Sequence, residues 1–450
     1  MALTGLDIFK LLPKTNCREC GSPTCLAFAM LLAQKKVELS KCPHVSEAAK
    51  AALASAAAPP IRKITIGTGP KAFAIGEETQ LYRHEGKFNR PCGVGITIAD
   101  NLDHDALSAR LKAINDLQFR RVGQDIAVNM VVLINQSSSA ATFAKAAAAV
   151  AQGTELPIML CAPLADNLKA ALEPTQEKKP VLHAATTENA AAVAALGKSA
   201  GVPVVARAEN LEALADLTEQ IKVAGVEDIL LDVTAPKTSE TLQRLTIVRR
   251  LALKKNFRSL GYPMVVFAQG NDPADLAADA AAFVAKYAGI VVLDSVEPYV
   301  VLPVLTARQN IYTDPQKPIQ VEAKLYEIGE PGDNSPVMFT TNFSLTYFSV
   351  EGDVESARIP AYIIAVDTEG TSVLTAYSGD KLNEKVVAKA IKACGIEQKV
   401  KHRKLIIPGY VAVMSGKLEE ETGWKVLVGP KESSQLPAYL KMVWAKEAVS

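Results

Sequence analysis

The sequence lacks an excess of charge of either sign, and it lacks a long apolar run. Its 49 Lys and Arg residues balance 48 Asp and Glu residues, which removes electrostatic attraction as an argument for nucleic acid or an anionic membrane as partner. The longest apolar stretch, AAFVAKYAGIVVLDSV, is interrupted by Lys286 and Asp294. A helix that crosses a bilayer needs roughly 20 apolar residues, so no membrane span is predicted.

The first residues, MALTGLDIFKLLPK, have neither the continuous apolar segment nor the cleavage site of a signal peptide, and a cytoplasmic location is expected. Cysteine is scarce as well, with seven in the chain. In a reducing compartment, clustered cysteines indicate metal or redox chemistry rather than structural disulfides.

Four of the cysteines lie in one stretch, NCRECGSPTCLAFAMLLAQKKVELSKCPH. Cys17, Cys20 and Cys25 form a C-x2-C-x4-C run, and Cys42 follows directly before a proline. Zinc sites usually contain two paired ligand knuckles, whereas a compact triplet with a remote Cys-Pro is typical of iron–sulfur ligation. The spacing therefore favours a [4Fe–4S] cluster over zinc or free thiols.

The helix that follows the third cysteine supports the same interpretation. Thr24 is predicted to cap the helix CLAFAMLLAQKK, which puts Cys25 in its first turn. The positive end of the helix dipole would then face an anionic cluster. The remaining cysteines, Cys92, Cys161 and Cys394, stand alone in strand or helix patterns and are predicted to be small buried residues.

Short β-branched runs alternate with helical stretches from residue 94 to about 320. There are eight such runs: VGITIA, VNMVVLI, PIMLC, PVLHA, PVVA, DILLDV, PMVVF and GIVVL. Eight βα units in about 250 residues predict a (β/α)8 barrel. A doubly wound open sheet has the same local pattern and is the alternative.

The predicted strands end in polar residues, at the rim where barrel enzymes have their catalytic groups. No pair among them forms a recognisable acid–base or metal motif, and helix caps and loop contacts explain them equally well. A structural role is therefore predicted for this set. Its members are Asp100, Asn135, Cys161, Arg207, Asp232, Gln269 and Asp294.

The last part of the chain has a different pattern. The stretch VMFTTNFSLTYFSVEGDVES alternates in the manner of an antiparallel strand pair, and a helix is predicted over 383–393. Three parallel-strand candidates end at glycine turns, at Gly370, Gly409 and Gly429. Ligands of open α/β sheets lie outside the carboxyl ends of the strands. The three turns are thus either plain connections or the wall of one ligand site.

The stretch LTGLDIFKLLPKTNCRECGSPTCLAFAMLLA resembles the N-terminus of the large (gamma) subunit of the corrinoid iron–sulfur proteins. These proteins are the methyl carriers of the anaerobic acetyl-CoA (Wood–Ljungdahl) pathway. The resemblance extends over essentially the whole chain, through TQLYRHEGKF, RRLALKKNFRSLGYP, RQNIYTDPQKPI, TTNFSLTYFSVEGD, VDTEGTSVLTAY and IIPGYVAVMSGKLEEETGW.

The resemblance implies an α/β chain in successive parts. These are a [4Fe–4S] domain (1–57), a linker with short strands (58–93), a (β/α)8 TIM-like barrel (94–325) and a Rossmann-like α/β domain that binds a corrinoid (326–450). It also implies a set of corrinoid contacts, of which those at Thr371 and Ser433 are expected to come from the backbone. The set is Thr340, Thr346, Gly370, Thr371, Ser372, Val373 and Ser433.

Many cobalamin proteins supply a lower cobalt ligand from a D-x-H-x-x-G loop, and the sequence has none. His402 is the one histidine in this part of the chain. It precedes the strand KLIIPG, at the edge away from the glycine turns. We therefore expect His402 to be a surface residue and the cobalt to have no protein lower ligand.

The resemblance implies a carrier rather than a stand-alone enzyme. Cobalt would accept a methyl group from methyltetrahydrofolate through a methyltransferase and deliver it to the nickel site of acetyl-CoA synthase/CO dehydrogenase. The cluster would return Co(II) to Co(I). Further implied partners are a small subunit, in a heterodimer, and a low-potential donor such as ferredoxin. Segments 46–60 and 326–336 are expected to absorb domain motion.

Two alternatives remain open. One is a pterin-dependent methyltransferase that acts in its own barrel. The other is an iron–sulfur electron-transfer subunit whose C-terminal part binds a nucleotide or flavin, for which a G-x-G-x-x-G turn would be expected. No such turn occurs in that part of the sequence.

Overall fold

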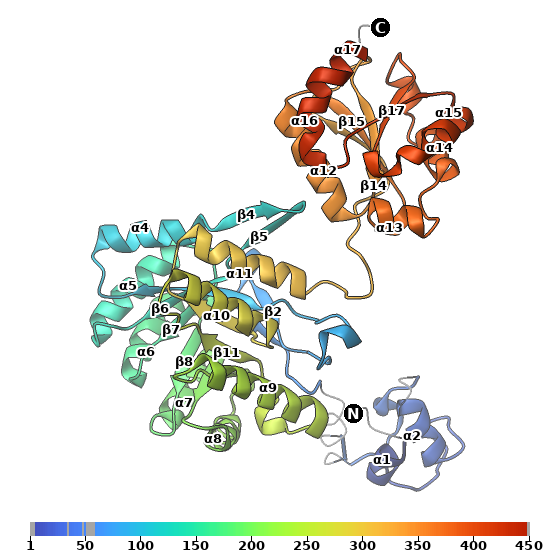
Figure 1. Cartoon of the computed structure of the whole chain (residues 1–450). Coiled ribbons are helices and arrows are strands. Elements are labelled where there is room, and N and C mark those ends of the chain that lie inside the picture. The colour runs from blue at the N-terminus through green and yellow to red at the C-terminus, as the bar shows by residue number, and fades with distance from the viewer. Residues whose placement is uncertain (1–4, 34–35, 47–48, 51–58, 448–450) are drawn as a thin grey trace. The chain divides into compact units, whose positions relative to one another are not determined.

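The computed structural model describes residues 5–33, 36–46, 49–50 and 59–447 (Figure 1). The chain forms two compact units, one of residues 1–119 and 126–312, the other of residues 120–125 and 313–450. Most of the linker predicted over 46–60 lies outside the described residues. Within the described ranges, no helix has the length and apolarity that crossing a membrane requires.

The N-terminal segment packs two short helices on a small apolar core. They are α1 (Gly5–Leu11) and α2 (Cys25–Ala33). The Oγ1 of Thr24 accepts a hydrogen bond from the backbone N of Ala27 at 3.1 Å, which confirms the predicted helix cap. Cys25 is consequently the first residue of α2, where backbone N–H groups have no partner within the helix.

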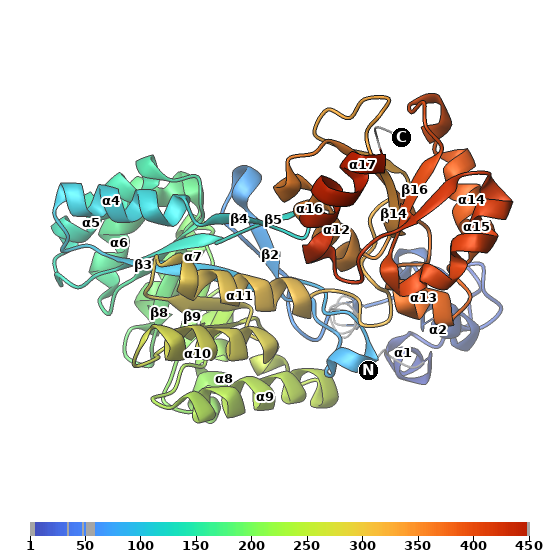
Figure 2. The same ribbon diagram turned by 45° about the horizontal axis from the view of Figure 1, so that its top comes forward.

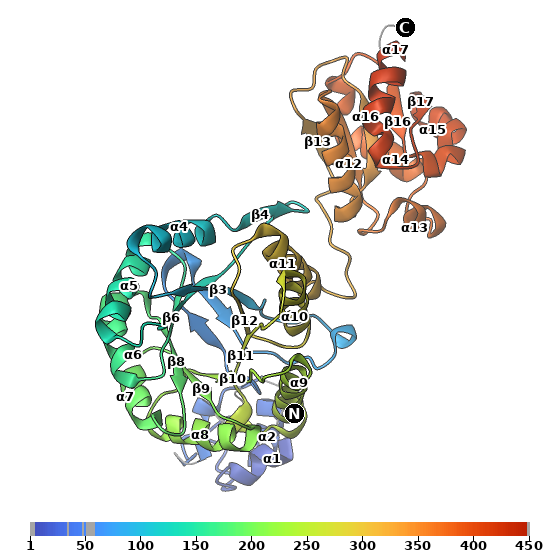
Figure 3. The ribbon, with the colours of Figure 1, turned by 60° about the vertical axis from the view of Figure 1, so that its left-hand side comes forward.

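Eight parallel strands close into a barrel in the spatial order β3-β6-β7-β8-β9-β10-β11-β12, and Figure 3 shows helices around it. All eight predicted strands are confirmed, and the open-sheet alternative is wrong. The strands are β3 (Gly93–Ala99), β6 (Met130–Ile134), β7 (Ile158–Cys161), β8 (Val181–Ala185), β9 (Val204–Arg207), β10 (Ile229–Asp232), β11 (Met264–Phe267) and β12 (Ile290–Leu293).

Each barrel strand is followed by a helix, and side-chain caps start several of these helices. Asp103, Ser139 and Asn210 each accept a hydrogen bond from a backbone N–H in the first turn. The helices are α4 (His104–Asn115), α5 (Ala140–Gly153), α6 (Ala165–Leu172), α7 (Ala190–Ala200), α8 (Leu211–Val223), α9 (Thr238–Lys255), α10 (Pro273–Ala285) and α11 (Pro298–Ile311).

A hairpin closes the N-terminal end of the barrel. Its strands are β1 (Ile64–Ile66) and β2 (Phe73–Ile75), whose isoleucines join the apolar side chains inside the barrel. Gly93 starts β3, and a Cβ at this position would lie 2.5 Å from the ring of Phe73. A second hairpin, of β4 (Gln118–Arg121) and β5 (Gln124–Ala127), follows α4 and was not predicted.

The C-terminal unit is built on a five-stranded sheet in the order β13-β15-β14-β16-β17. β13 is antiparallel to β15, and the other neighbours are parallel. The strands are β13 (Leu325–Ile328), β14 (Val337–Thr341), β15 (Ala361–Val366), β16 (Lys404–Ile407) and β17 (Lys425–Val428).

The antiparallel pair predicted for VMFTTNFSLTYFSVEGDVES is wrong. The first five residues form β14, and most of the remainder forms helix α12 (Ser344–Ala357). All five β14 residues are buried, because helices cover both faces of the sheet. The aromatic and β-branched residues of α12 favour strands in isolation, but their burial against the sheet selects the helix.

Helices lie on both faces of this sheet (Figure 2), and alternate residues of β14 belong to the apolar cores of opposite layers. Met338 belongs to the core that includes α12 and α16 (Leu436–Tyr439), whereas Phe339 belongs to the core under the other layer. That second layer comprises α13 (Val373–Ser378), α14 (Glu384–Ala393) and α15 (Ser415–Thr422). Asn383 caps α14, so the helix predicted over 383–393 is confirmed.

The segment 326–336, predicted to be a hinge, is part of this sheet and the loop beside it. β13 pairs with β15 over four residues. In the loop that follows, the carbonyl oxygen of Pro331 accepts a hydrogen bond from the Tyr362 hydroxyl at 3.1 Å. The backbone N of Lys401 donates to the carbonyl oxygen of Asp333 at 2.9 Å. The structure therefore places this segment within the C-terminal unit rather than at the boundary between the two units.

Candidate functional site

The four clustered cysteines differ in exposure, but all four lie in the N-terminal segment that contains α1 and α2. Cys25 and Cys42 are buried, Cys20 is partly buried, and Cys17 is exposed. Cys25 and Cys42 share one apolar core, and Cys20 packs against it. The fold thus gathers three of the four predicted ligands around a single core.

The fourth cysteine is linked to the same place through a polar contact. Cys17, Glu19 and His44 have potential ligand atoms that all lie within 4.8 Å of one another. The Nε2 of His44 lies 3.0 Å from the Oε2 of Glu19. Because His44 is two residues beyond Cys42, this contact brings the two ends of the cysteine motif together.

The backbone around the cysteines suits an anionic group. Cys25 donates its backbone N–H to the Oδ1 of Asn16 at 2.8 Å, and the backbone N of Asn16 donates to the Cys25 sulfur at 3.4 Å. The φ angle is positive at Asn16 (49°), Arg18 (67°) and Gly21 (77°). Left-handed residues alternating with ordinary ones direct amide groups toward one concavity, where they stabilise anions. This donor set fits an iron–sulfur cluster.

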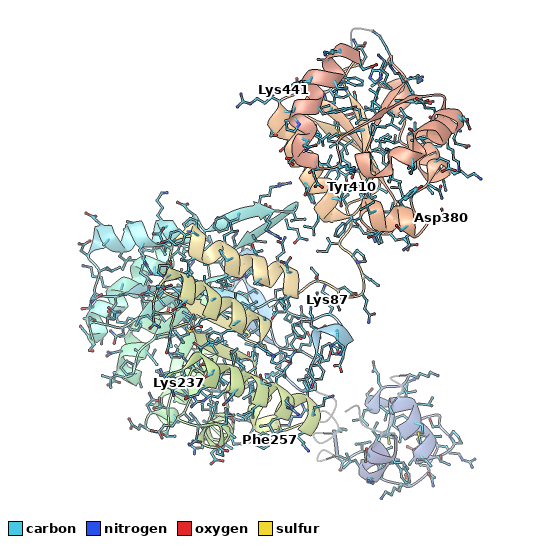
Figure 4. All side chains as sticks on the ribbon, viewed as in Figure 1. Lys87, Lys237, Phe257, Asp380, Tyr410 and Lys441 are labelled. Carbon is cyan, nitrogen blue, oxygen red and sulfur yellow. The ribbon has the colours of Figure 1, made fainter. Side chains whose placement is uncertain are left out.

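A pocket of about 370 Å³ opens at the carboxyl ends of β14, β16 and β17, and we call it the strand-end pocket. Its walls come from separate parts of the C-terminal unit: the first turns of α12, the start of α13, and the turns after β16 and β17. Tyr410, which is labelled in Figure 4, is one of the wall residues. The pocket therefore lies where ligands of open α/β sheets bind.

Most of the predicted corrinoid contacts line this pocket. They are Thr340, Thr346, Ser372, Val373 and Ser433. Gly370 and Thr371 lie in the loop that leads to Ser372 and are outside the lining. The turns at Gly409 and Gly429 approach each other, since the backbone N of Gly409 donates to the carbonyl oxygen of Pro430 at 3.0 Å.

Thr340 shows that the strand-end pocket is suited to a polar ligand. Its side chain is 1% exposed, and its Oγ1 has no hydrogen-bond partner among the described residues. Buried hydroxyl groups are rarely unpaired, because an unmade hydrogen bond costs about 1–3 kcal/mol. The neighbouring Thr341 hydroxyl is also unpaired within the described part of the chain, but Thr341 does not line the pocket.

Asn342 fixes the loop after β15, and sequence reasoning missed it. Its Oδ1 accepts hydrogen bonds from the backbone N of Thr368 and of Gly370, both at 3.0 Å. Gly370 has a φ of 71°, and a Cβ there would lie 2.5 Å from the side chain of Gln320. Glycine is therefore required in this loop. Asparagine is common after strands, so the sequence alone does not predict that Asn342 fixes this loop.

His402 lies at the end of β16 opposite to the strand-end pocket. Its Nε2 lies 2.9 Å from the carbonyl oxygen of Ser335, and its Nδ1 accepts a hydrogen bond from the backbone N of Lys404 at 3.2 Å. Burial lowers the pKa of this imidazole. The prediction of a surface residue is corrected, because the ring is partly buried and packs edge-on against Trp444.

The three isolated cysteines are distributed as small core residues. Cys92 and Cys161 are buried, as predicted, whereas Cys394 is only partly buried at the C-terminal end of α14. Burial raises the pKa of the Cys92 thiol to about 12. Cys92 is therefore uncharged and inert at neutral pH.

The fold and the two candidate sites define a class of protein: a βα barrel joined in one chain to a cysteine-rich segment and to an α/β ligand-binding domain. The family model of the CO dehydrogenase/acetyl-CoA synthase delta subunit matches residues 63–440, and a family model for an Fe-S cluster matches residues 12–44.

Full-length relatives identify the family. The corrinoid/iron-sulfur protein large subunit of Moorella thermoacetica is 47% identical over 441 residues, which cover 98% of this chain and 99% of the relative. The acetyl-CoA decarbonylase/synthase complex subunit gamma of Methanothermobacter thermautotrophicus is 38% identical over 453 residues, with 98% and 99% covered. The chain belongs to this family of corrinoid/iron–sulfur large subunits, and the resemblance seen in the sequence is confirmed.

Among solved structures, the dihydropteroate synthase of Thermus thermophilus matches with a TM-score of 0.40 and 16% identity. The match covers 55% of this chain and 100% of that enzyme.

Proposed function

We propose that this chain is a methyl carrier that binds a corrinoid in the strand-end pocket. The observation that carries the proposal is the buried hydroxyl of Thr340, which has no partner among the described residues, in a largely apolar pocket that also contains the hydroxyls of Ser372 and Ser433. When bound, the corrinoid supplies a cobalt that takes a methyl group from methyltetrahydrofolate and gives it to the nickel site of acetyl-CoA synthase. Thr340, Ser372 and Ser433 offer hydroxyl groups to the polar tail of such a ligand.

Replacement of Thr340 by valine tests this assignment. Valine keeps the shape of the side chain but removes the hydroxyl. The Kd of the corrinoid should therefore rise about fivefold, because one hydrogen bond of about 1 kcal/mol is lost. The corrinoid-free chain should be no less stable, since its unpaired buried hydroxyl is removed. Corrinoid titration by visible absorption and thermal melting measure the two effects.

Thr341→Val is the matched control for this experiment. Thr341 is buried like its neighbour, and its hydroxyl also has no partner among the described residues, but Thr341 does not line the strand-end pocket. This variant should gain stability and bind the corrinoid as the unaltered chain does. Equal corrinoid affinity in the two valine variants would contradict the assignment of Thr340.

We also propose that Cys17, Cys20, Cys25 and Cys42 hold one [4Fe–4S] cluster. The family model for an Fe-S cluster spans all four cysteines, and Cys25 stands at the positive end of the α2 dipole. When bound, the cluster supplies the electron that restores the reduced cofactor after accidental oxidation. The four thiolate ligands would be negatively charged, and the partial positive charges of the backbone N–H groups between Asn16 and Gly21 would stabilise them.

The cobalt is proposed to have no lower ligand from this chain. His402 is separated from the strand-end pocket by the length of β16, and both of its ring nitrogens contact backbone atoms. A pocket that offers no histidine ligand would make the reduced, nucleophilic state of a bound corrinoid easier to reach.

Replacement of His402 by alanine should leave the cobalt site unchanged. The electron paramagnetic resonance lines of the Co(II) state should show no axial nitrogen splitting before or after the change. Melting temperature should fall, because the variant loses the ring contacts with Trp444 and Ser335. Nitrogen splitting that disappears in His402→Ala would show that the imidazole binds cobalt.

The rim of the strand-end pocket indicates a shared site. Leu345, Leu374 and Tyr410 line the pocket and are 50%, 47% and 41% exposed. Large apolar side chains gathered at an open pocket mark a surface that another molecule covers. We propose that the small subunit of the corrinoid/iron–sulfur heterodimer covers this rim. The methyltransferase, acetyl-CoA synthase and a low-potential donor such as ferredoxin would approach in turn.

A second candidate function is methyl transfer by the barrel itself. It requires the purified chain, without a separate methyltransferase, to move a methyl group from methyltetrahydrofolate to added corrinoid. The carrier function instead requires that this activity appear only when a methyltransferase is supplied. Anaerobic assays with and without that enzyme distinguish the two functions.

A further inference from the structure

The interior of the barrel changes from apolar to polar at its C-terminal end. Val181, Val205 and Leu230 point into the barrel and belong to its apolar core. Two residues further along, the same strands and their neighbour β7 place polar groups on the inner face, below a cavity of about 500 Å³. We call these four residues the polar layer: Cys161, His183, Arg207 and Asp232.

Two members of the polar layer form a buried ion pair. The Nε2 of His183 lies 3.0 Å from the Oδ2 of Asp232, and the two side chains are 9% and 1% exposed. Burial alone would lower the pKa of His183, but the Cys161 sulfur and the Asp232 carboxylate raise it to about 10. Thr234 adds a backbone N–H to the Oδ1 of Asp232 at 2.9 Å. The imidazole is thus held in its charged form at neutral pH.

Cys161 lies next to this charged ring. Cys161 on β7 and His183 on β8 are direct partners in the barrel register, so their side chains stand side by side. Both line the same cavity. A cysteine beside an imidazole is a recurrent nucleophile arrangement, in which the sulfur attacks an electrophilic carbon. Cys161, His183 and Asp232 therefore have the order of a nucleophile, an imidazole that holds the proton beside it and an orienting carboxylate.

Arg207 adds a positive charge at the mouth of the cavity. Its Nε lies 3.6 Å from the Oδ2 of Asp232, while its side chain is 56% exposed. A guanidinium group in this position is able to pair with a carboxylate.

The requirements of the barrel fold do not account for the polar layer. A buried ion pair is often no more stable than an apolar pair of the same volume, and the inward positions just below are apolar. A metal site does not account for it either. Among the described residues, the potential ligand atoms of Cys161, His183 and Asp232 do not form a metal-binding group.

We propose that the barrel mouth is a second ligand site, for a small carboxylate that bears a thiol-reactive carbon. Arg207 binds the carboxylate, and the sulfur of Cys161 attacks the carbon. A carbon–sulfur bond forms, the leaving group departs with the electron pair of the bond that breaks, and the thiol proton stays on His183. This site is independent of the strand-end pocket and of the cysteine motif.

Competitive alkylation of the complete chain, with its cofactors in place, tests the proposal. Iodoacetate and iodoacetamide carry the same reactive carbon, but only iodoacetate has a carboxylate. Peptide mass spectrometry should show Cys161 alkylated about tenfold faster than the partly buried Cys394, with Cys92 unmodified until the chain is unfolded. At Cys161 alone, iodoacetate should react several-fold faster than iodoacetamide.

Two variants separate the parts of the site. Arg207→Met alters an exposed side chain and should remove the preference for iodoacetate, which lowers the ratio of the iodoacetate rate to the iodoacetamide rate. Asp232→Asn keeps a hydrogen-bond acceptor for His183 but removes the charge, and should slow both reagents. The proposal is overturned if Cys161 reacts no faster than Cys394 in the folded chain, or if the two reagents react equally with Cys161.

Discussion

Replacement of Cys20 by alanine should abolish iron binding while leaving the rest of the chain folded. Anaerobically purified chain should contain about four irons, and the variant should contain almost none. Cys20 is partly buried and only packs against the edge of its apolar core, so the lost volume has little effect on folding. Methyl transfer should persist when the cofactor is supplied already reduced, and should decay without recovery after oxidation.

Cys394→Ala is the matched control, because Cys394 is also a partly buried free cysteine but lies in the C-terminal unit. It should retain both iron and recovery. A Cys20→Ala chain that kept four irons would contradict the ligand assignment. Loss of methyl transfer even from the pre-reduced cofactor would contradict the repair role of the cluster.

Replacement of Thr346 by phenylalanine should remove most of the bound corrinoid. Thr346 lies in the first turn of α12 and lines the strand-end pocket, so an aromatic ring at this position occupies space within its volume of about 370 Å³. When an added side chain overlaps with a well-packed ligand, the binding free energy typically falls by about 3 kcal/mol or more. A loss of this size lowers the affinity more than a hundredfold. Cobalt content after purification and corrinoid titration measure the effect.

Ser356→Phe provides the control on the same helix. Ser356 is exposed in the last turn of α12 and is outside the pocket lining. It introduces the same aromatic ring into the same element, so corrinoid content should stay at the unaltered level. If Thr346→Phe retained its corrinoid, the ligand would have to bind elsewhere on the chain.

The barrel could be predicted from sequence because its strands are buried on both sides. Runs such as MVVLI and GIVVL are continuously apolar, as expected for parallel strands between a filled interior and a layer of helices. The β4–β5 hairpin was missed for the opposite reason. Half of its strand residues are exposed and most are polar, so no apolar period marks Gln118–Arg121 or Gln124–Ala127 as strands.

The candidate sites were only partly accessible from sequence. The cysteine motif could be found because metal ligands within one short segment have a readable spacing. The strand-end pocket depends on segments far apart in the chain, from Thr340 to Ser433, and only the family resemblance joined them. The sequence predicts a structural role for Cys161, Arg207 and Asp232 and does not single out His183, because the contact between His183 and Asp232 arises only when the barrel closes.

The walls of the strand-end pocket come from three separate strand–helix connections, so a bound ligand affects how long the folded protein lasts. The turns that contain Ser372, Tyr410 and Ser433 each belong to a different strand–helix connection. A ligand that contacts all three adds its binding free energy to the free energy of unfolding, about 2.7 kcal/mol at a hundredfold excess over Kd. A chain made without its cofactor would unfold more often and be exposed to proteases. Cobalt supply would therefore set how much of the protein survives, before any methyl group is transferred.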